Sequence, residues 1–402
     1  MDFGLSGQSI MCFAGEDWWY HHPHSKNHIL KRLAQQNRVL FINSLSLGLP
    51  SPSNPDFFLK IRRKLKSYMR WLKRVPEGLW VMSPVSLPFF GSRAARAVNL
   101  FLLVVQVRLA MLICGIRQPI LWIAIPSAAD VAGWFGAKLV LYHVSDKYDA
   151  NEDSSVSADV IRALDKKLKS RADAVLYSGR KLFQESDAPH RYFLEQAVDF
   201  DHFAVEAATT AEEIARIPRP VLGYMGALDF IMDVPLIEEV ARRRRDWHWV
   251  FIGLRSNLVQ IVAPNVHFLG PKNYSDLPQY LRHVDVCVLP WRRDSAFISY
   301  GSAIKVREYL ATGKPVVISP MYEYQNTPGI RTYRTADEFI ARVEDALNRD
   351  GATDRELRQS VVRNCTWDVR ARELGSLISS LLRGQTVFEA TTPQEAESLT
   401  HS

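Results

Sequence analysis

Cysteine is scarce in this sequence, and several short motifs with known chemistry are missing. Four cysteines are scattered along 402 residues without a CxxC pair, which excludes a disulfide scaffold or a zinc ribbon. No expected strand is followed by GxGxxG, and neither GxxxxGKS/T nor GxSxG occurs, which disfavours dehydrogenases, kinases and hydrolases. The first residues, MDFGLSGQSIMCF, lack the basic segment that opens a signal peptide, so we expect a cytoplasmic protein.

Acidic residues are missing from one stretch of the chain. The sequence carries 50 Lys and Arg against 43 Asp and Glu, a formal net charge of +7. Eight basic residues and no acidic one lie between Phe57 and Pro76, and the remainder of the chain is near neutral. A nucleic-acid-binding protein spreads basic charge over its binding face, so this distribution disfavours a nucleic-acid partner.

Two segments invite a membrane interpretation. From Phe57 to Val75, apolar residues recur at helical spacing among lysines and arginines. This pattern predicts an amphipathic helix on an anionic membrane surface, where each basic residue contributes about 1 kcal/mol; a solvated helix packed on its own domain is the alternative. Residues 94–116 are rich in Leu and Val but include Arg96 and Arg108. Because Arg at the bilayer centre costs roughly 2.5–3.5 kcal/mol, we expect a core or interface-facing helix there, not a span.

Short apolar runs alternate with helical patterns along almost the whole chain. Continuous Val, Ile and Leu runs are typical of strands buried on both faces of a parallel sheet. The strands expected in the first half are 8–13, 38–43, 79–83, 120–125, 139–144, 174–178 and 192–198. After a polar linker at 206–220, the expected strands are 221–225, 249–253, 266–269, 286–290 and 315–319. Two consecutive α/β units predict two Rossmann-like domains facing across a cleft.

Residues 299–320, SYGSAIKVREYLATGKPVVISP, carry the most informative pattern. We expect a loop that leads into a helix, with Gly313 as the C-cap of that helix. Lys305 and Glu308 are three residues apart and therefore share a helix face. The backbone N–H groups of the first turn, with Ser302 and Lys305, suit a diphosphate, and Glu308 suits the vicinal hydroxyls of a ribose. This pattern outlines a nucleotide-diphosphate site; an ordinary surface pair is the alternative.

That segment resembles the donor-site helix of GT-B fold glycosyltransferases, whose signature ends in Gly-x-Pro-Val-Val. Other blocks follow in the same family's order. Residues 223–228, GYMGAL, resemble the glycine-rich loop that opens the nucleotide-binding domain and include Gly226. Residues 266–281, VHFLGPKNYSDLPQYL, resemble the stretch whose turns hold the base, which implies roles for Lys272 and Tyr274. The resemblance implies an α/β GT-B fold and a nucleotide-sugar substrate, with no metal and no other cofactor.

Within that fold, the sequence is similar to the subgroup of the xanthan glucuronosyltransferase and the teichuronic-acid glycosyltransferases. Those proteins have a Lys in the donor helix, matched by Lys305, and a strand ending in Tyr-x-Val-x-Asp, matched by residues 142–146. The resemblance implies that Asp146 is the catalytic base, with Asp149 and Glu152 as substitutes. A helix N-cap or an ordinary loop carboxylate is the alternative for Asp146.

The resemblance also assigns roles to the parts of the chain. Residues 1–205 are expected to form the acceptor-binding domain and residues 216–365 the nucleotide-sugar-binding domain. Residues 366–384 resemble the helix that crosses back to the first domain. The polar residues 385–402 are expected to form a disordered tail.

Two further groups of residues could hold a metal, but another role is favoured for each. Asp199 and Asp201 have the Asp-x-Asp form, yet they lie in QAVDFDHF, which resembles the family's interdomain loop. Four histidines follow the first strand, namely His21, His22, His24 and His28. Only His24 and His28 have a spacing that suits zinc, so we expect no metal site. Instead, we expect this loop to line the acceptor cleft, with His24 or Lys26 near the substrate.

We therefore expect a glycosyltransferase that moves a sugar from a nucleotide diphosphate to a lipid-linked or oligosaccharide acceptor in envelope or exopolysaccharide synthesis. The resemblance implies that this nucleotide is UDP. Many retaining relatives have a Glu at the position of Tyr300, so the sequence favours an inverting reaction. The basic amphipathic segment predicts a peripheral protein on the inner face of the cell membrane. A retaining transferase of the same fold and a non-catalytic scaffold of polysaccharide assembly are the alternatives.

Overall fold

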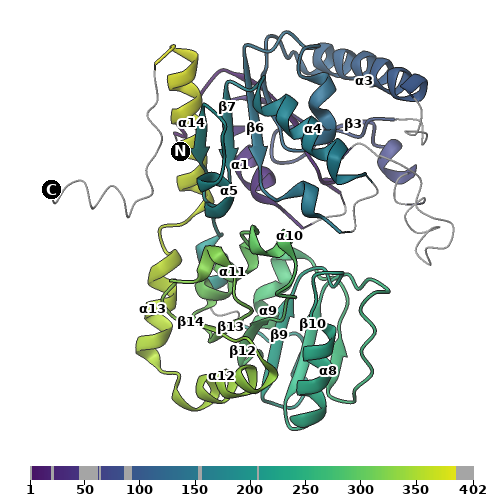
Figure 1. The fold of residues 1–402 in the computed structure, drawn as a ribbon. Coiled ribbons are helices and arrows are strands. Elements are labelled where there is room, and N and C mark those ends of the chain that lie inside the picture. Colours follow the sequence, from purple (N-terminus) through teal and green to yellow (C-terminus); the bar gives the residue numbers. More distant parts are fainter. Residues whose placement is uncertain are drawn as a thin grey trace. The chain divides into compact units, whose positions relative to one another are not determined.

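The computed structural model describes residues 2–19, 22–44, 62, 65–85, 93–152, 156–205 and 208–385. The chain divides into two compact units, whose elements are labelled in Figure 1. The first unit contains Met1–Ser178, Leu182–Glu195 and Arg370–Ser402. The second contains Gly179–Lys181 and Gln196–Val369. Most of the expected tail, 386–402, lies outside the described residues.

The first unit is built on a sheet of eight strands in the order β3-β4-β2-β1-β5-β6-β7-β8. Its strands are β1 (Ser9–Phe13), β2 (Arg38–Ile42), β3 (Leu72–Arg74), β4 (Trp80–Met82), β5 (Ile120–Ile123), β6 (Leu139–Val144), β7 (Ala174–Tyr177) and β8 (Arg191–Phe193). All neighbouring strands pair in parallel except β3 and β4. The central strands are buried on both faces because their side chains are apolar throughout, as the continuous apolar runs predicted.

Helices connect the parallel strands of this first sheet. They are α1 (Ser25–Leu33), α3 (Arg93–Cys114), η1 (Pro126–Val131), η2 (Tyr148–Ala150), α4 (Ala158–Lys169) and α5 (Arg180–Gln184), which lies where the two units divide. The chain passes from β1 to β2 on one side and later returns to β5 on the other side of β1. The order of the strands therefore reverses between β1 and β5, which is where open α/β sheets place their ligands.

The basic segment at 57–75 does not form the single helix that its spacing predicts. Residues 57–61, 63 and 64 lie outside the described residues, and the helical conformation stops at Tyr68. Leu72–Arg74 instead forms β3, which pairs antiparallel with β4. Pairing with β4 satisfies the backbone of this segment, and the exposed Lys73 and Arg74 suit the edge of a sheet.

The second unit is built on a sheet of six parallel strands in the order β11-β10-β9-β12-β13-β14. Its strands are β9 (Val221–Met225), β10 (His248–Ile252), β11 (Val266–Phe268), β12 (Val286–Leu289), β13 (Val316–Ile318) and β14 (Ile330–Thr332). Its helices are α6 (Phe200–Ala204), α7 (Glu212–Ala215), α8 (Val234–Arg243), η3 (Tyr274–Asp276), α9 (Leu277–Leu281), α10 (Ala296–Ser299), α11 (Ile304–Thr312), η4 (Tyr322–Tyr324), α12 (Ala336–Arg349) and α13 (Ala352–Val362). The strand order here reverses between β9 and β12.

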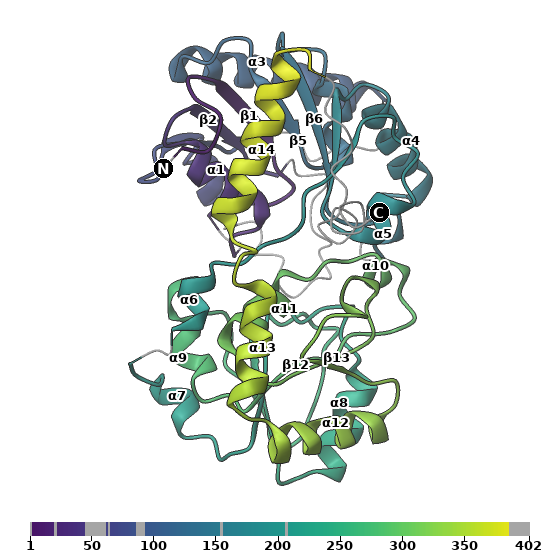
Figure 2. The same cartoon turned by 90° about the vertical axis from the view of Figure 1, so that its left-hand side faces the viewer.

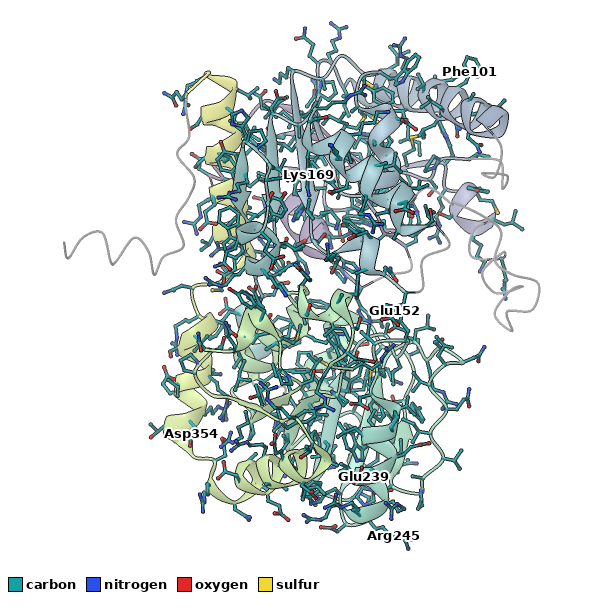
Figure 3. All side chains as sticks on the ribbon, viewed as in Figure 1. Phe101, Glu152, Lys169, Glu239, Arg245 and Asp354 are labelled. Carbon is teal, nitrogen blue, oxygen red and sulfur yellow. The ribbon has the colours of Figure 1, made fainter. Side chains whose placement is uncertain are left out.

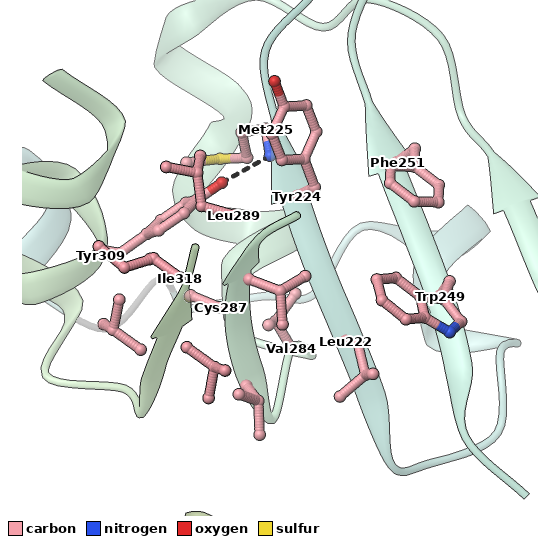
Figure 4. Close-up of a cluster of buried hydrophobic side chains, with 14 of the residues drawn as sticks. Leu222, Tyr224, Met225, Trp249, Phe251, Val284, Cys287, Leu289, Tyr309 and Ile318 are labelled. Carbon is pink, nitrogen blue, oxygen red and sulfur yellow. Dashed lines mark hydrogen bonds between the residues drawn. The ribbon is translucent and has the colours of Figure 1, made fainter. Parts of the chain in front are cut away.

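The core of the second unit fixes α11 against the end of β9. Figure 4 shows the backbone N–H of Met225 donating a hydrogen bond of 2.8 Å to the hydroxyl of the buried Tyr309, one turn into α11. The expected linker contributes to this core, because Ile214 of α7 and Ile217 are buried among its apolar side chains. Residues 208–220 are thus packed on the second unit.

The C-terminal helix α14 (Trp367–Leu382) completes the first unit from the far end of the sequence. A Cβ atom at Gly375 would lie 1.9 Å from the carbonyl oxygen of Phe3, so glycine is required at this crossing. Phe3 and Leu5 are buried there. Figure 2 shows α14 beside the N-terminus and α1.

Candidate active site

The residues of the expected donor site gather at the switch point of the second sheet. Met225 ends β9, Gly226 follows it, and Trp291 follows β12. Lys305 lies in the first turn of α11, and Gly313 ends that helix with a φ of 72°, which confirms the expected C-cap. A ligand bound at this switch point would meet the carboxyl ends of β9 and β12 and the N-terminal end of α11.

Lys305 is held by aromatic side chains at this point. Its Nζ donates a hydrogen bond of 3.1 Å to the hydroxyl of Tyr224 and lies 4.7 Å from the centre of the Trp291 ring. Trp291 Nε1 also donates to the Tyr224 hydroxyl, at 3.2 Å, and that hydroxyl donates to the carbonyl of Ala227. No carboxylate forms an ion pair with Lys305 in the described part of the chain. Two of the three ammonium protons are therefore available for an anionic ligand.

Gly226 allows the chain to pass close to this ammonium group. A Cβ atom at Gly226 would lie 2.5 Å from Lys305 Nζ, and the residue has a φ of 134°, which L side chains rarely adopt. Glycine is therefore needed where the loop after β9 passes this ammonium group. The structure brings Gly226 and Lys305 together as the resemblance implied.

Glu308 stands one turn further along α11 and is half-buried. Burial raises the pKa of Glu308 to about 7, the positive charge of Lys305 lowers it, and the negative charge of Asp199 raises it. Asp199 in turn accepts a hydrogen bond of 3.3 Å from the hydroxyl of Tyr274. Glu308 has no hydrogen-bond partner of its own within the described residues. Its carboxylate is thus free to accept hydrogen bonds from two hydroxyls of a sugar.

Ser302 is positioned by a buried network and not by the helix end alone. Arg307 donates to the hydroxyl of Ser302 at 3.3 Å and forms a buried ion pair of 3.2 Å with Glu323. Tyr324 donates to the carbonyl of Ala303 at 2.7 Å, which fixes the residue that precedes α11. This network orders the loop whose N–H groups would face a phosphate.

Lys272 and Tyr274 were expected to hold the base, and the structure gives each of them protein partners. Lys272 forms an ion pair with Glu213 and lies 5.3 Å from the centre of the Tyr280 ring. Tyr274 stacks on His202 and donates to Asp199, so it reaches the Glu308 group indirectly. The structure therefore links Tyr274 to the site and places Lys272 in a separate set of contacts.

In the first unit, Asp146 follows β6 by two residues and is half-buried. It does not cap a helix, because Lys147 is the N-cap of η2 and no side chain completes that cap. Burial raises the pKa of Asp146, the charge of Lys26 opposes the rise, and the charge of Glu16 adds to it. A desolvated carboxylate at the carboxyl end of a parallel strand suits a general base.

Lys26 and Glu16 form a buried ion pair near Asp146. The pair joins Nζ to Oε2 at 3.4 Å, and the side chains are only 5% and 8% exposed. Burial alone would lower the pKa of Lys26, but the charges of Glu16, Tyr148, Cys12 and Asp146 outweigh it and raise the pKa. The ammonium group therefore stays protonated between two carboxylates.

Tyr148 ties this cluster to the switch point of the first sheet. Its hydroxyl donates a hydrogen bond of 3.0 Å to the carbonyl of Ala124, the residue directly after β5. The hydroxyl of Ser145 lies 3.2 Å from the same Tyr148 hydroxyl. Glu16 comes from the loop after β1 and Lys26 from the first turn of α1. The cluster is thus assembled from the carboxyl ends of β1, β5 and β6.

The remaining candidates have weaker positions. Asp149 is paired with Lys147 and Arg162, and Glu152, labelled in Figure 3, has an exposed side chain. His24 is the N-cap of α1. No group of three or more metal-ligating side chains occurs among the residues that the structure describes.

Sequence reasoning did not assign Glu16, Tyr148, Tyr224 or Trp291 to these two groups, and it placed Asp199 in an interdomain loop and not beside Glu308. Tyr224 and Trp291 lie at the ends of the two strands that flank the switch point, which is a signal that the strand order would have supplied. Glu16 carries no such signal, because an acidic residue in a loop is normally solvated.

Comparison with known proteins identifies similar sequences and folds. Residues 219–349 match the family model described as glycosyl transferases group 1. A curated protein of Bacillus subtilis (strain 168), "Putative teichuronic acid biosynthesis glycosyltransferase TuaH", is 25% identical over 279 residues, which cover 63% of this chain and 70% of that protein.

Solved structures share the fold over nearly the whole chain. Sucrose-phosphate synthase from Thermosynechococcus elongatus is 13% identical with a TM-score of 0.69, covering 94% of this chain and all of that one. Anabaena HepE, solved in complex with UDP and glucose, is 12% identical with a TM-score of 0.64 and covers 93% of this chain and all of its own.

The two sheets and these matches define a GT-B fold, as the sequence predicted. The family match and the curated relative identify a glycosyl-transferring enzyme. The match to the glycosyl transferases group 1 model lies within the second unit and includes Lys305 and Glu308, and the chain is similar to a putative teichuronic acid biosynthesis glycosyltransferase.

Proposed function

We propose that this protein transfers a sugar from a UDP-sugar to a lipid-linked or saccharide acceptor during synthesis of an envelope polysaccharide or exopolysaccharide. The observation that carries the proposal is the pair Lys305 and Glu308 at the switch point. Within the described residues, the ammonium group of Lys305 has no carboxylate partner and Glu308 has no hydrogen-bond partner. A nucleotide diphosphate supplies the negative charge that Lys305 can pair with. Its ribose hydroxyls can donate hydrogen bonds to Glu308. The TuaH relative supports the polysaccharide class, and the UDP in the HepE structure supports the nucleotide.

The proposed reaction is a single inverting displacement. Asp146 accepts the proton of the acceptor hydroxyl while the acceptor oxygen forms a bond to the anomeric carbon. The bond from that carbon to the diphosphate breaks, and the electron pair leaves with UDP. A positioned base of this kind contributes about 10²–10⁴-fold to the rate. Lys305 and the N-terminal end of α11 stabilise the leaving diphosphate, so the reaction proceeds without a metal.

The acceptor is presented at a membrane in this proposal. The described part of the basic segment exposes Leu65 and Met69, at 57% and 86%, beside the exposed Arg70, Lys73 and Arg74. Such a surface suits an anionic leaflet. The enzyme would then work in the cytoplasm, on the inner face of the cell membrane, where a lipid-linked acceptor and a soluble nucleotide sugar meet.

Calorimetric titration with UDP, without and with Mg²⁺, tests the donor site. We expect metal-independent binding by the wild-type chain and a loss of about 10²-fold for Lys305→Ala, because charge-assisted hydrogen bonds to phosphate are lost. Lys314→Ala, just beyond the C-terminal end of α11, is the matched control and should bind normally. Failure of the wild-type chain to bind any of UDP, GDP, dTDP or CMP would favour the scaffold alternative.

The stereochemistry needs its own measurement. NMR of the transfer product reports whether the anomeric configuration of the donor is inverted, as proposed here. A product that keeps the donor configuration would establish a retaining transferase and remove Asp146 from the role of base.

A further inference from the structure

The helix α3 of the first unit is unusually apolar for a helix that is largely uncovered. The 18 residues Ala97–Cys114 have a mean hydropathy of 2.2 and are long and apolar enough to cross a membrane, yet only 33% of them are buried. The core helix of a soluble domain with this composition would be mostly buried. The exposed part of α3 therefore needs a partner other than the first unit.

The two sides of α3 have different surroundings. Its inner side is formed by Leu103, Val107 and Ala110, which are buried, and α3 contacts β2 and η1. The exposed apolar side chains recur at helical spacing on the other side: Val98, Phe101, Val105, Leu109, Leu112 and Ile113. Phe101 is 67% exposed and Leu112 79%, and Figure 3 shows Phe101 on the outer side of the helix. We call these six residues the α3 face.

The border of the α3 face carries an aromatic residue and positive charge. Trp134 is 47% exposed, and its carbonyl accepts a hydrogen bond of 3.0 Å from Arg108 of α3. Arg38 donates to the carbonyl of Gly115 at the C-terminal end of the helix, at 2.9 Å. Between Glu77 and Asp130 the sequence contains four arginines and no acidic residue. Tryptophan and arginine beside an apolar surface are typical of the membrane–water interface.

We propose that the α3 face lies flat in the surface of an anionic lipid bilayer and is a principal membrane contact of this protein. The face extends about 22 Å along the helix at 1.5 Å per residue, long enough to order the first unit on a surface. The packed inner side keeps α3 part of the first unit, so the helix lies along the membrane and does not cross it. This surface is separate from the nucleotide site and goes beyond the basic segment at 57–75.

Charge favours lipid over a second copy of the chain. A symmetric dimer would bring two copies of the same face together, and each copy carries Arg108 and no acidic residue on α3. The arginines would then lack a counter-charge, whereas anionic headgroups supply one. Burial of the exposed apolar side chains in the acyl region adds the non-ionic part of the attraction.

Flotation of the full-length chain with lipid vesicles tests this proposal. The vesicles are phosphatidylcholine alone or phosphatidylcholine mixed with phosphatidylglycerol, and the variant is Phe101→Ser with Leu112→Ser. We expect the wild-type chain to float with the mixed vesicles and the variant to bind at least about tenfold more weakly. The matched control changes two exposed apolar residues of the second unit, Leu258→Ser with Val262→Ser, and should float like the wild type.

A second readout does not depend on any variant of the α3 face itself. Brominated lipids quench tryptophans that reach the acyl region, and Trp134→Phe should remove most of the quenching seen in the wild-type chain. Equal flotation of the Phe101/Leu112 variant and the wild type would overturn the proposal. The proposal would also be overturned if the wild-type chain sediments as a dimer and the Phe101/Leu112 variant as a monomer, while both float equally. A second copy of the chain would then cover the α3 face. UDP titration of the same variant separates the two proposals, because its affinity in solution should be unchanged.

Discussion

The two units place a lysine at the same position and use it differently. Lys26 and Lys305 are each the second residue of a helix that begins beside the switch point of its sheet. Lys26 is 5% exposed and paired with Glu16 inside the first unit. Lys305 is half-buried, and in the described part of the chain its ammonium group contacts the Tyr224 hydroxyl and two aromatic rings and forms no ion pair. The first unit neutralises its lysine within the fold, and the second leaves its lysine for a ligand.

This difference between the two lysines indicates different roles for the two units. A buried ion pair contributes little net stability but is costly to break, so Lys26 and Glu16 shape the surroundings of Asp146. An ammonium group over aromatic rings has N–H donors left for a further acceptor, so Lys305 can bind a diphosphate. Variants at Asp146 and Lys26 in the first unit should therefore change turnover and stability. Variants around Lys305 in the second unit should change the affinity for the nucleotide.

The largest effect is expected at Asp146. Asp146→Asn should lower kcat by about 10²–10⁴-fold, because the amide cannot accept the proton of the acceptor hydroxyl. Its affinity for UDP, which depends on the second unit, should stay unchanged. Steady-state kinetics with Asp149→Asn as the control decide the assignment. A large loss for Asp149→Asn alone would transfer the role of base to Asp149.

Lys26→Met should destabilise the first unit by about 3–5 kcal/mol, because it leaves the charge of Glu16 buried without its partner. Adding Glu16→Gln to the same chain should restore much of that loss. Urea unfolding measures both, and Lys31→Met is the control, since the Lys31–Glu77 pair is a third exposed and contributes about 0–1 kcal/mol. Retained stability in Lys26→Met would mean that the two lysines are equally dispensable to the fold.

Glu308 should make the stability of the second unit depend on pH up to about neutral pH. Its pKa rises from 4.5 to about 7 in the folded protein. The folded state therefore binds the proton more tightly, and the stability from this group is full below about pH 4.5 and is lost as pH rises through 7. Glu308→Gln should remove this pH dependence. At about pH 8 its free energy of unfolding should exceed that of the wild type by about 1–3 kcal/mol. Urea midpoints across this range measure it; parallel slopes for both chains would contradict the assignment.

The smallest effect is expected at Tyr224. Tyr224→Phe removes the hydroxyl that accepts from Lys305 and Trp291, at a cost of about 1 kcal/mol, or about fivefold in UDP affinity. Calorimetry of this variant beside Tyr280→Phe, a hydroxyl paired with Glu213 away from Lys305, measures the difference. A tighter complex in Tyr224→Phe would show that the hydroxyl competes with the diphosphate for Lys305.

Patterns within one segment predicted much of the second unit. The strand 221–225 is observed at those bounds, and Lys305, Glu308 and Gly313 share one helix and its cap, so local spacing was enough to group them. β14 was not expected, because its three residues IRT carry no continuous apolar run.

Contacts between distant segments could not be predicted in the same way. The Lys26–Glu16 pair and the Asp199–Tyr274 hydrogen bond depend on which strand ends are neighbours. The edge strand β3 was not predicted for a related reason. Its residues continue the helical spacing of the segment before it, and the strand forms because they pair with β4. Local propensity was therefore a poor guide where the backbone found a partner elsewhere in the chain.

The crossing of α14 over Phe3 has a consequence for the order of synthesis. The second unit is one nearly continuous stretch, Gln196–Val369, whereas the first needs both ends of the sequence. While the ribosome is still making α14, the buried Phe3 and Leu5 have no cover, although most of the first sheet already exists. The unit that is translated first is therefore completed last, and its apolar surface around Phe3 stays uncovered until α14 has been synthesised.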